Sequence, residues 1–172
     1  GDVSINGWSI EARICAEDPS RGFLPTTGMI TRYAAPQGRN VRVDSGVDAG
    51  SAVTIHYDSL LAKVAAWGAD REDARKTLIK ALNGYHIEGV ITNVDFANSI
   101  LAHPAFVSGA LSTDFINEHF EDGKSKIPAS KENLHYMAMA ALLVYHSRRN
   151  QVRNSLKHML PSVGGGETSQ SI

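Results

Sequence analysis

Apolar and polar residues alternate strictly between residues 8 and 17. One side of this segment carries only apolar residues, namely Trp8, Ile10, Ala12, Ile14 and Ala16. A period of two predicts a strand with one buried and one exposed face. Further short strands are predicted over 27–33, 40–47 and 51–57, because stretches with turn-forming proline, glycine or aspartate separate them.

Residues 60–67 form a nearly continuous apolar run that only Lys63 interrupts. Such a run is typical of a strand that is covered on both faces. Together with the preceding strands, it predicts an antiparallel meander in the first half of the chain.

The period of the apolar positions changes after residue 70. Apolar residues then recur at helical spacing, at Ala74, Leu78, Ala81, Leu82 and Tyr85. We expect Asp70 to cap this helix and Asn93 to cap a second one, which Pro104 helps to end near residue 103. A short third helix is predicted over 113–120. The predicted class is therefore α+β, an antiparallel sheet meander followed by packed helices.

A polar, broken stretch at 121–128 suggests a domain boundary. We expect a domain over 1–122 and, over 123–172, a linker with one amphipathic helix at 130–147 and a loose glycine-rich tail. The chain begins with Gly1 and its first methionine is Met29, which favours a piece excised from a longer protein.

Composition narrows the function classes. The 172 residues contain 17 Lys and Arg against 18 Asp and Glu, a formal net charge of -1. No basic field is available for nucleic acid or an anionic membrane, so neither is an expected partner. The single cysteine excludes an intramolecular disulfide.

The common sequence motifs of catalytic sites are absent. The chain has no glycine-rich phosphate loop, no His-Glu-x-x-His and no cysteine pair, and its seven histidines are scattered. We therefore expect no metal site. Cys15 lies in the middle of a predicted strand, which favours a small buried side chain over a nucleophile.

Two charged positions stand out. Arg13 lies on the polar face of the first strand, where Glu11 and Glu17 could hold its guanidinium in one rotamer. The planar fork of an arginine suits a carboxylate, bicarbonate, a phosphate or a developing enolate oxygen. A surface ion pair is the alternative. Asp58 lies at the junction of two apolar runs, where strand ends can meet a site, and a simple turn is the alternative there.

Six segments of the chain, in order and at matching spacings, resemble the C-terminal domain of biotin carboxylase. They are Gly7-x-x-x-Glu11-x-Arg13-x-x-Ala16-Glu17-Asp18-Pro19, Phe23-Leu24-Pro25-x-x-Gly28, Val41-Arg42-x-Asp44-x-Gly46, Tyr57-Asp58-Ser59-Leu60-Leu61-Ala62-Lys63, Gly89-Val90-x-Thr92-Asn93 and Ser112-Thr113-x-Phe115-Ile116. The resemblance runs from about residue 7 to residue 120.

This resemblance implies a component of a biotin-dependent acyl-CoA carboxylase of the acetyl-, propionyl- or methylcrotonyl-CoA type, a ligase of the ATP-grasp class. Such an enzyme uses ATP, Mg²⁺ and bicarbonate to carboxylate biotin on a carrier domain. The family's pocket arginine falls on Arg13, whose implied role is to hold the ureido oxygen and favour the enolate that makes biotin nucleophilic. We assign Arg13 and Asp58 to substrate binding and Arg13 to catalysis.

The resemblance also implies what lies elsewhere. The family's ATP-binding lysines, glycine-rich flap and metal carboxylates precede this domain, so the chain should be inactive alone. Implied partners are the N-terminal and ATP-grasp domains, the biotin carboxyl carrier domain and the carboxyltransferase subunit, which the 130–147 helix would approach. In dimeric members the arginine that matches Arg42 lies at the subunit interface, beside an aromatic residue; Asn40 stands in that neighbourhood here. A bacterial cytoplasm or a mitochondrial matrix would suit the protein.

Two other function classes remain open from the residues alone. A non-catalytic interaction module would use the 130–147 helix as its binding face and would not depend on Arg13. A small independent hydrolase would use Cys15 or Asp58 with a histidine and would turn over substrate by itself.

Overall fold

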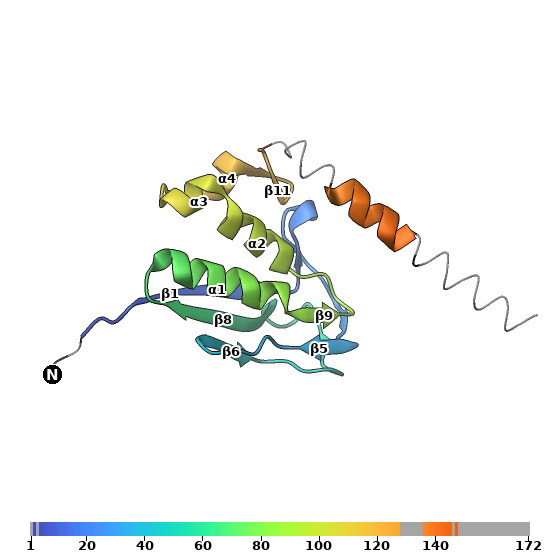
Figure 1. The fold of residues 1–172 in the computed structure, drawn as a ribbon. Coiled ribbons are helices and arrows are strands. Elements are labelled where there is room, and N and C mark those ends of the chain that lie inside the picture. Colours follow the sequence, from blue (N-terminus) through green and yellow to red (C-terminus); the bar gives the residue numbers. More distant parts are fainter. Residues whose placement is uncertain (1, 3, 128–135, 146, 148–172) are drawn as a thin grey trace, which may run out of the picture. The chain divides into compact units, whose positions relative to one another are not determined.

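The computed structural model describes residues 2, 4–127, 136–145 and 147, and the chain separates into two compact units, 1–127 and 128–172. The strands of the first unit are β1 (Trp8–Cys15), β2 (Glu17–Asp18), β3 (Leu24–Pro25), β4 (Gly28–Met29), β5 (Arg32–Ala34), β6 (Val41–Ser45), β7 (Ala52–Val53), β8 (Leu60–Gly68), β9 (His86–Glu88), β10 (Phe120–Glu121) and β11 (Lys124–Ser125). Its helices are η1 (Pro19–Arg21), a 3₁₀ turn, and α1 (Arg71–Asn83), α2 (Val94–Ala102), α3 (Pro104–Ser108) and α4 (Phe115–His119). Antiparallel strands with separate helices confirm the predicted α+β class (Figure 1).

The main sheet has three antiparallel strands in the order β1-β8-β6. In the β1–β8 pair, Ile10 lies opposite Ala66, Ala12 opposite Val64 and Ile14 opposite Ala62. The long strand β8 therefore lies between β1 and β6, a refinement of the predicted meander that no local pattern indicates. Four two-stranded pairs complete the described strands: β2–β3, β4–β7, β5–β9 and β10–β11.

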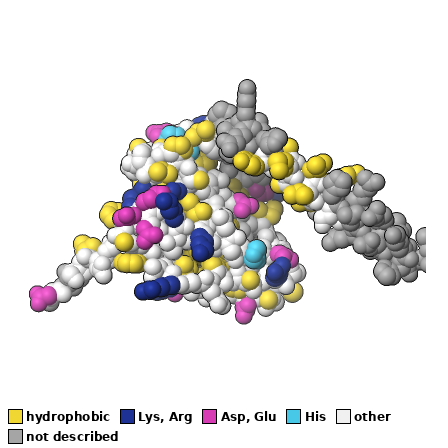
Figure 2. All heavy atoms as spheres, viewed as in Figure 1, with side chains coloured by type: hydrophobic (Ala, Val, Ile, Leu, Met, Phe, Trp, Pro, Cys, Tyr) yellow, Lys and Arg dark blue, Asp and Glu magenta, His cyan; other side chains and the backbone are white. Residues whose placement is uncertain are grey.

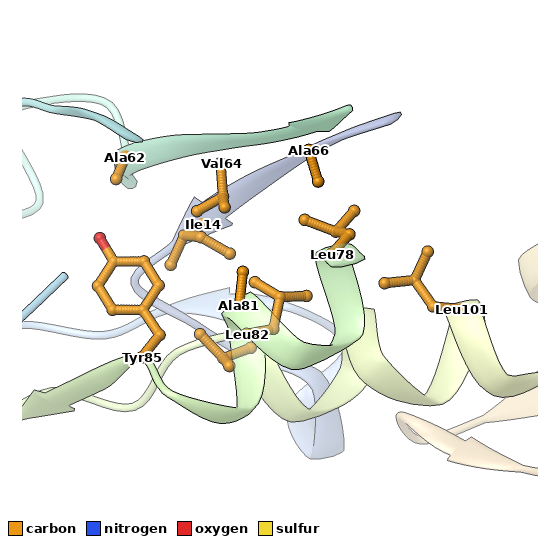
Figure 3. Packing of buried hydrophobic residues seen from close by; sticks show 10 residues of the cluster. Ile14, Ala62, Val64, Ala66, Leu78, Ala81, Leu82, Tyr85 and Leu101 are labelled. Carbon is orange, nitrogen blue, oxygen red and sulfur yellow. The ribbon is translucent and has the colours of Figure 1, made fainter. Parts of the chain in front are cut away.

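Helix α1 covers one face of this sheet. Asp70 caps it as predicted, because its Oδ1 accepts the backbone N–H of Asp73 at 2.8 Å. The buried side of α1 carries Ala74, Leu78, Ala81 and Leu82. Figure 3 shows Leu78 beneath Val64 and Ala66 of β8, with Leu101 of α2 beside it. This cluster is the larger of two buried clusters in the first unit; the other contains Phe96, Phe115 and Phe120.

Within the described residues, the opposite face of the sheet is open from Lys63 onwards, whereas Leu61 at the start of β8 is buried on it. Lys63 and Trp67 of β8 are exposed on it, while Ala62, Val64 and Ala66 are buried beneath α1. The prediction that residues 60–67 are covered on both faces is therefore wrong for the part from Lys63 to Trp67 and holds only at the start of the strand, where Leu61 and Ala62 are both buried. The apolar run instead reflects a central strand whose outward positions include Ala65, a half-buried alanine.

Arg75 of α1 forms an ion pair within its own helix and a hydrogen bond to the second helix. The Arg75 guanidinium donates to Glu72 at 2.6 and 2.7 Å and to the Leu101 carbonyl oxygen of α2 at 2.8 Å. Hydrogen bonding to Arg75, above all, lowers the pKa of Glu72 to about 2. Figure 2 shows acidic and basic side chains standing together over the left end of α1.

The helical half departs from prediction at two places. Pro104 begins α3 rather than only ending α2, because proline suits the first turn, where a missing N–H is not needed. Helix α4 is shorter than the predicted 113–120 and passes directly into β10.

In the second unit, residues 136–145 form a helix whose side chains are exposed, including Met137, Leu142 and Leu143. The rest of the predicted 130–147 helix, apart from residue 147, and the predicted tail lie outside the described residues. Among the described residues, no helix has the length and hydropathy needed to cross a membrane.

The start of β1 is held by a tryptophan of β8. The indole Nε1 of Trp67 donates to the Asn6 carbonyl oxygen at 2.9 Å. Gly7 has φ 72°, and a Cβ there would stand 2.4 Å from the Trp67 ring. Only glycine combines this conformation with such a close approach.

A buried histidine, His103, predicts a pH-dependent stability. It is 6% exposed, its Nδ1 accepts the Ala105 N–H at 3.2 Å, and its Nε2 has no partner among the described residues. Burial, with His119 nearby, lowers the pKa of His103 from 6.5. The folded state therefore binds fewer protons than the unfolded state, so stability is present above pH 6.5 and declines as the pH falls below it.

We expect the urea concentration at the midpoint of unfolding to be lower at pH 5.5 than at pH 7. His103→Asn should make this difference smaller. Asparagine keeps an acceptor for the Ala105 N–H but does not titrate. His86→Asn, at an exposed position of β9, is the matched control. Equal pH dependence in the wild type and His103→Asn would show that His103 does not contribute.

Candidate functional site

Arg13 stands on the open face of the sheet. The alternation of β1 turns Ile10, Ala12 and Ile14 towards the core, so Arg13 points the other way and is exposed, as predicted. Its guanidinium makes no hydrogen bond or ion pair with any described residue. The expected contacts with Glu11 and Glu17 are not formed, because Glu17 accepts a hydrogen bond from Ser59 instead.

A second cationic side chain lies next to Arg13 on the open face of the sheet. Lys63 of β8 lies directly opposite Arg13 in the register, on the same side of the sheet. Like charges at directly opposed positions disfavour each other. Neither side chain has an acidic partner within 4 Å in the described part of the chain. Asp44 of β6 lies opposite Lys63 on its other side, so Arg13 is the cation of the two without an acidic residue opposite it in the register. A ligand that brings negative charge beside Arg13 would therefore be stabilised.

The Asp58 loop closes against the end of β1. The Ala16 N–H donates to the Ser59 carbonyl oxygen at 2.8 Å, and the Ser59 hydroxyl donates to Glu17 at 2.5 Å. Asp58 is exposed, and its Oδ1 accepts the Leu60 N–H at 3.2 Å, which is a turn contact. The structure thus places Asp58 at the same end of β1 as Arg13 but without a direct bond between them.

Cys15 lies among these groups and is half-buried. Burial, and then the charge of Glu17, raises the pKa of its thiol. A raised pKa keeps the thiol protonated at neutral pH, which disfavours a nucleophilic role.

Arg42 lies away from this group, on β6 at the other edge of the sheet. It pairs with Asp44 through two hydrogen bonds of 2.9 and 2.7 Å. Hydrogen bonding between the two raises the pKa of Arg42 and lowers that of Asp44. The predicted interface residue is therefore separated from Arg13 by β8, although its partner Asp44 lies opposite Lys63.

A hollow of about 320 Å³ lies along the outer edge of β1, on the side of the sheet that the helices cover, and Arg13 contributes to its lining. Glu11 and Glu17 contribute to its lining, and most of the remaining surface is apolar, including Phe23, Phe96 and Ile100. A ligand that joins a polar head to a hydrocarbon arm would suit such a mixed lining.

The described residues bring together no group of three or more His, Cys, Asp or Glu side chains that could hold a metal ion. They do fit a carbonyl ligand such as the ureido group of biotin, because the Arg13 fork offers unused donors. Mg²⁺ and ATP would need residues outside this site.

Sequence reasoning did not identify two contributors. Lys63 comes opposite Arg13 only through a pairing across 50 positions of the chain. Asn93 bonds to the backbone of β1 at Arg13 and Cys15, where only a helix cap was predicted. No local pattern reports either contact.

The domain belongs to the class in which helices cover one face of a three-stranded antiparallel sheet. Its other face carries the unpaired arginine. The family model described as "Biotin carboxylase C-terminal domain" matches residues 11–118. The chain therefore belongs to the biotin carboxylase C-terminal domain family, as the sequence resemblance implied.

Curated relatives agree with this assignment. The propionyl-CoA carboxylase alpha chain of Ruegeria pomeroyi is 33% identical over 187 residues, covering 95% of this chain and 28% of the relative. The mitochondrial methylcrotonoyl-CoA carboxylase subunit alpha of Dictyostelium discoideum is 39% identical over 172 residues, covering 99% of this chain and 24% of the relative. The chain thus spans about a quarter of the length of these relatives.

Solved structures share the fold. The biotin carboxylase domain of 2-oxoglutarate carboxylase from Hydrogenobacter thermophilus, in complex with MgADP, ADP and bicarbonate, matches with a TM-score of 0.69 and 37% identity, over 73% of this chain and 28% of that one. The multifunctional pyruvate carboxylase of Rhizobium etli matches with a TM-score of 0.69 and 33% identity, over 76% and 13%.

Proposed function

We propose that this chain acts as the C-terminal domain of a biotin carboxylase and supplies Arg13 to the pocket in which biotin is carboxylated. The main support for this proposal is the guanidinium of Arg13, which has no partner among the described residues. Arg13 lies within the residues that match the family model and opposite a second cation, Lys63. Carboxylation would use ATP, Mg²⁺ and bicarbonate, bound mainly by other domains of the complete enzyme.

The chemistry required of this chain is electrostatic. Arg13 would donate hydrogen bonds to the ureido oxygen of biotin, where negative charge develops as the ring nitrogen becomes nucleophilic. Donors fixed before the reaction stabilise such charge without reorganising. Lys63 would add positive potential, and Asp58 would line the same end of β1 as a substrate-binding residue.

The chain spans about a quarter of the length of these relatives, which supports further domains as its partners. We propose that N-terminal and ATP-grasp domains, a biotin carboxyl carrier domain and a carboxyltransferase subunit act with this domain, in a bacterial cytoplasm or a mitochondrial matrix. Residues 1–122 would form the carboxylase domain and 123–172 the connection beyond it. Arg42 would serve at a subunit interface. The relatives carboxylate different acceptors by their names, so the family does not select one acyl-CoA.

The exposed apolar side chains of the 136–145 helix support a second candidate, a protein-interaction module. Its binding would persist in Arg13→Ala. Charged substitutions at Met137 and Leu143 would abolish it, which a pull-down with the carboxyltransferase subunit would show.

The direct test of the proposed function is ATP-dependent carboxylation of free biotin with labelled bicarbonate. We expect the complete carboxylase that contains this domain to form carboxybiotin and the 172-residue chain alone to form none. Turnover by the chain alone would contradict the proposal, and so would a complete protein that does not carboxylate biotin.

A further inference from the structure

Asn93 occupies the N-cap position of α2 without acting as a cap. Its side chain makes no hydrogen bond to the first turn of the helix. An asparagine that caps stabilises its helix. The structure forgoes that contribution and turns the amide towards β1.

Both ends of the Asn93 amide are bonded to the strand that carries Arg13. Nδ2 donates to the Arg13 carbonyl oxygen at 3.1 Å, and Oδ1 accepts the Cys15 N–H at 2.9 Å. The backbone N–H of Asn93 also donates to the Cys15 carbonyl oxygen, at 3.2 Å. The amide thus takes the place of a peptide group of a neighbouring strand at the outer edge of β1.

This contact lies where β1 is least regular. The pairing of β1 with β8 shifts between Ile14 and Cys15, because Ile14 lies opposite Ala62 and Cys15 opposite Leu60. Such irregularities bend a strand and redirect the neighbouring side chain. Backbone hydrogen bonds from Ala16 to Ser59 and from Asn93 to Cys15 also hold this end of β1, and the Asn93 amide adds the side-chain bond to the Arg13 carbonyl oxygen.

The segment before Asn93 is itself anchored. Gly89 has φ 104°, and a Cβ there would stand 2.0 Å from the Met29 carbonyl oxygen. Two residues later, the Ile91 carbonyl oxygen accepts the Thr26 hydroxyl at 2.7 Å. The Asn93 amide therefore approaches β1 from a fixed base.

We infer that Asn93 is a positioning residue for Arg13. It fixes the Arg13 carbonyl and the Cys15 amide, and through them the direction in which the Arg13 guanidinium leaves the strand. The inference rests on the proposed function, because the position of Arg13 matters only if the guanidinium binds the reacting group.

The test compares variants of the complete carboxylase in the free-biotin assay. Asn93→Ala removes both bonds, and Asn93→Asp keeps the acceptor for Cys15 but sets an oxygen against the Arg13 carbonyl. We expect either to lower kcat by about 10- to 100-fold, the cost of misplacing a catalytic group by about 1 Å. The KM for ATP should stay unchanged, because ATP is bound elsewhere.

Two comparisons separate positioning from general support. Asn98→Ala, on the same helix and bonded only to Asn83 among the described residues, should stay within about twofold of wild type. Adding Asn93→Ala to Arg13→Ala should cost less than about twofold more, because a residue that acts through Arg13 has nothing left to position.

The outcomes are distinguishable. If Arg13→Ala is inactive while Asn93→Ala and Asn93→Asp keep the wild-type kcat, the positioning role is wrong and the proposed function stands. A double variant that loses the product of both single losses would also overturn it. If Arg13→Ala itself keeps full activity, the proposed function fails first. Should Asn93→Ala not fold, the nearly isosteric Asn93→Asp decides.

Discussion

Arg13→Ala in the complete carboxylase is expected to lower kcat for free biotin by about 10²- to 10³-fold, the usual cost of losing one fixed donor to a developing negative charge. The guanidinium has no partner among the described residues, so its removal breaks no internal bond and should leave the fold intact. Steady-state kinetics with biotin as the varied substrate would measure the loss.

Arg39→Ala is the matched control, since Arg39 is exposed and makes no bond within the described residues. It should retain activity. Arg13→Lys should recover only part of the loss, because an ammonium lacks the planar fork. An Arg13→Ala enzyme as active as the control would show that Arg13 is only an exposed strand residue.

Leu78→Ala is expected to destabilise the first unit by about 3 to 5 kcal/mol. Leu78 is 0% exposed and packs in the cluster that joins α1 to the sheet, so alanine leaves a cavity there. The midpoint of urea unfolding, followed by circular dichroism on the 172-residue chain, would measure the change.

Lys80→Ala on the exposed side of the same helix controls for helix propensity and should cost less than about 0.5 kcal/mol. A similar midpoint for the two variants would mean that the α1–sheet contact does not limit the stability of the unit.

The spacing of apolar residues predicted the strands and helices whose buried positions repeat over a few residues of the sequence. β1 and α1 follow their patterns closely, and Asp70 caps α1 because a cap needs only residues three positions apart. The sheet order was not predictable, since it depends on pairing across about 50 positions. The open face of the sheet at β8 was not predictable either. Ala65 counts as an apolar residue in the sequence whether or not another element covers it.

The candidate site also has a part that the sequence predicts and a part that it does not. Arg13 could be placed on the exposed face from alternation alone, and the family resemblance supplied its role. Its surroundings could not be derived, because Lys63 and Asn93 reach it through long-range contacts. The expected contacts of Arg13 with carboxylates are not formed. Ser59, in the loop before β8, donates its hydroxyl to Glu17 instead.

The contact of Trp67 with the start of β1 provides an intrinsic optical probe. The chain has two tryptophans, and both stand at this end of the β1–β8 pair, Trp8 opposite Gly68 and Trp67 opposite Ser9. Indole emission therefore reports on the docking of β1, whereas far-ultraviolet dichroism is dominated by the helices. Following both signals during unfolding would show whether the strand that carries Arg13 detaches before the helical layer melts.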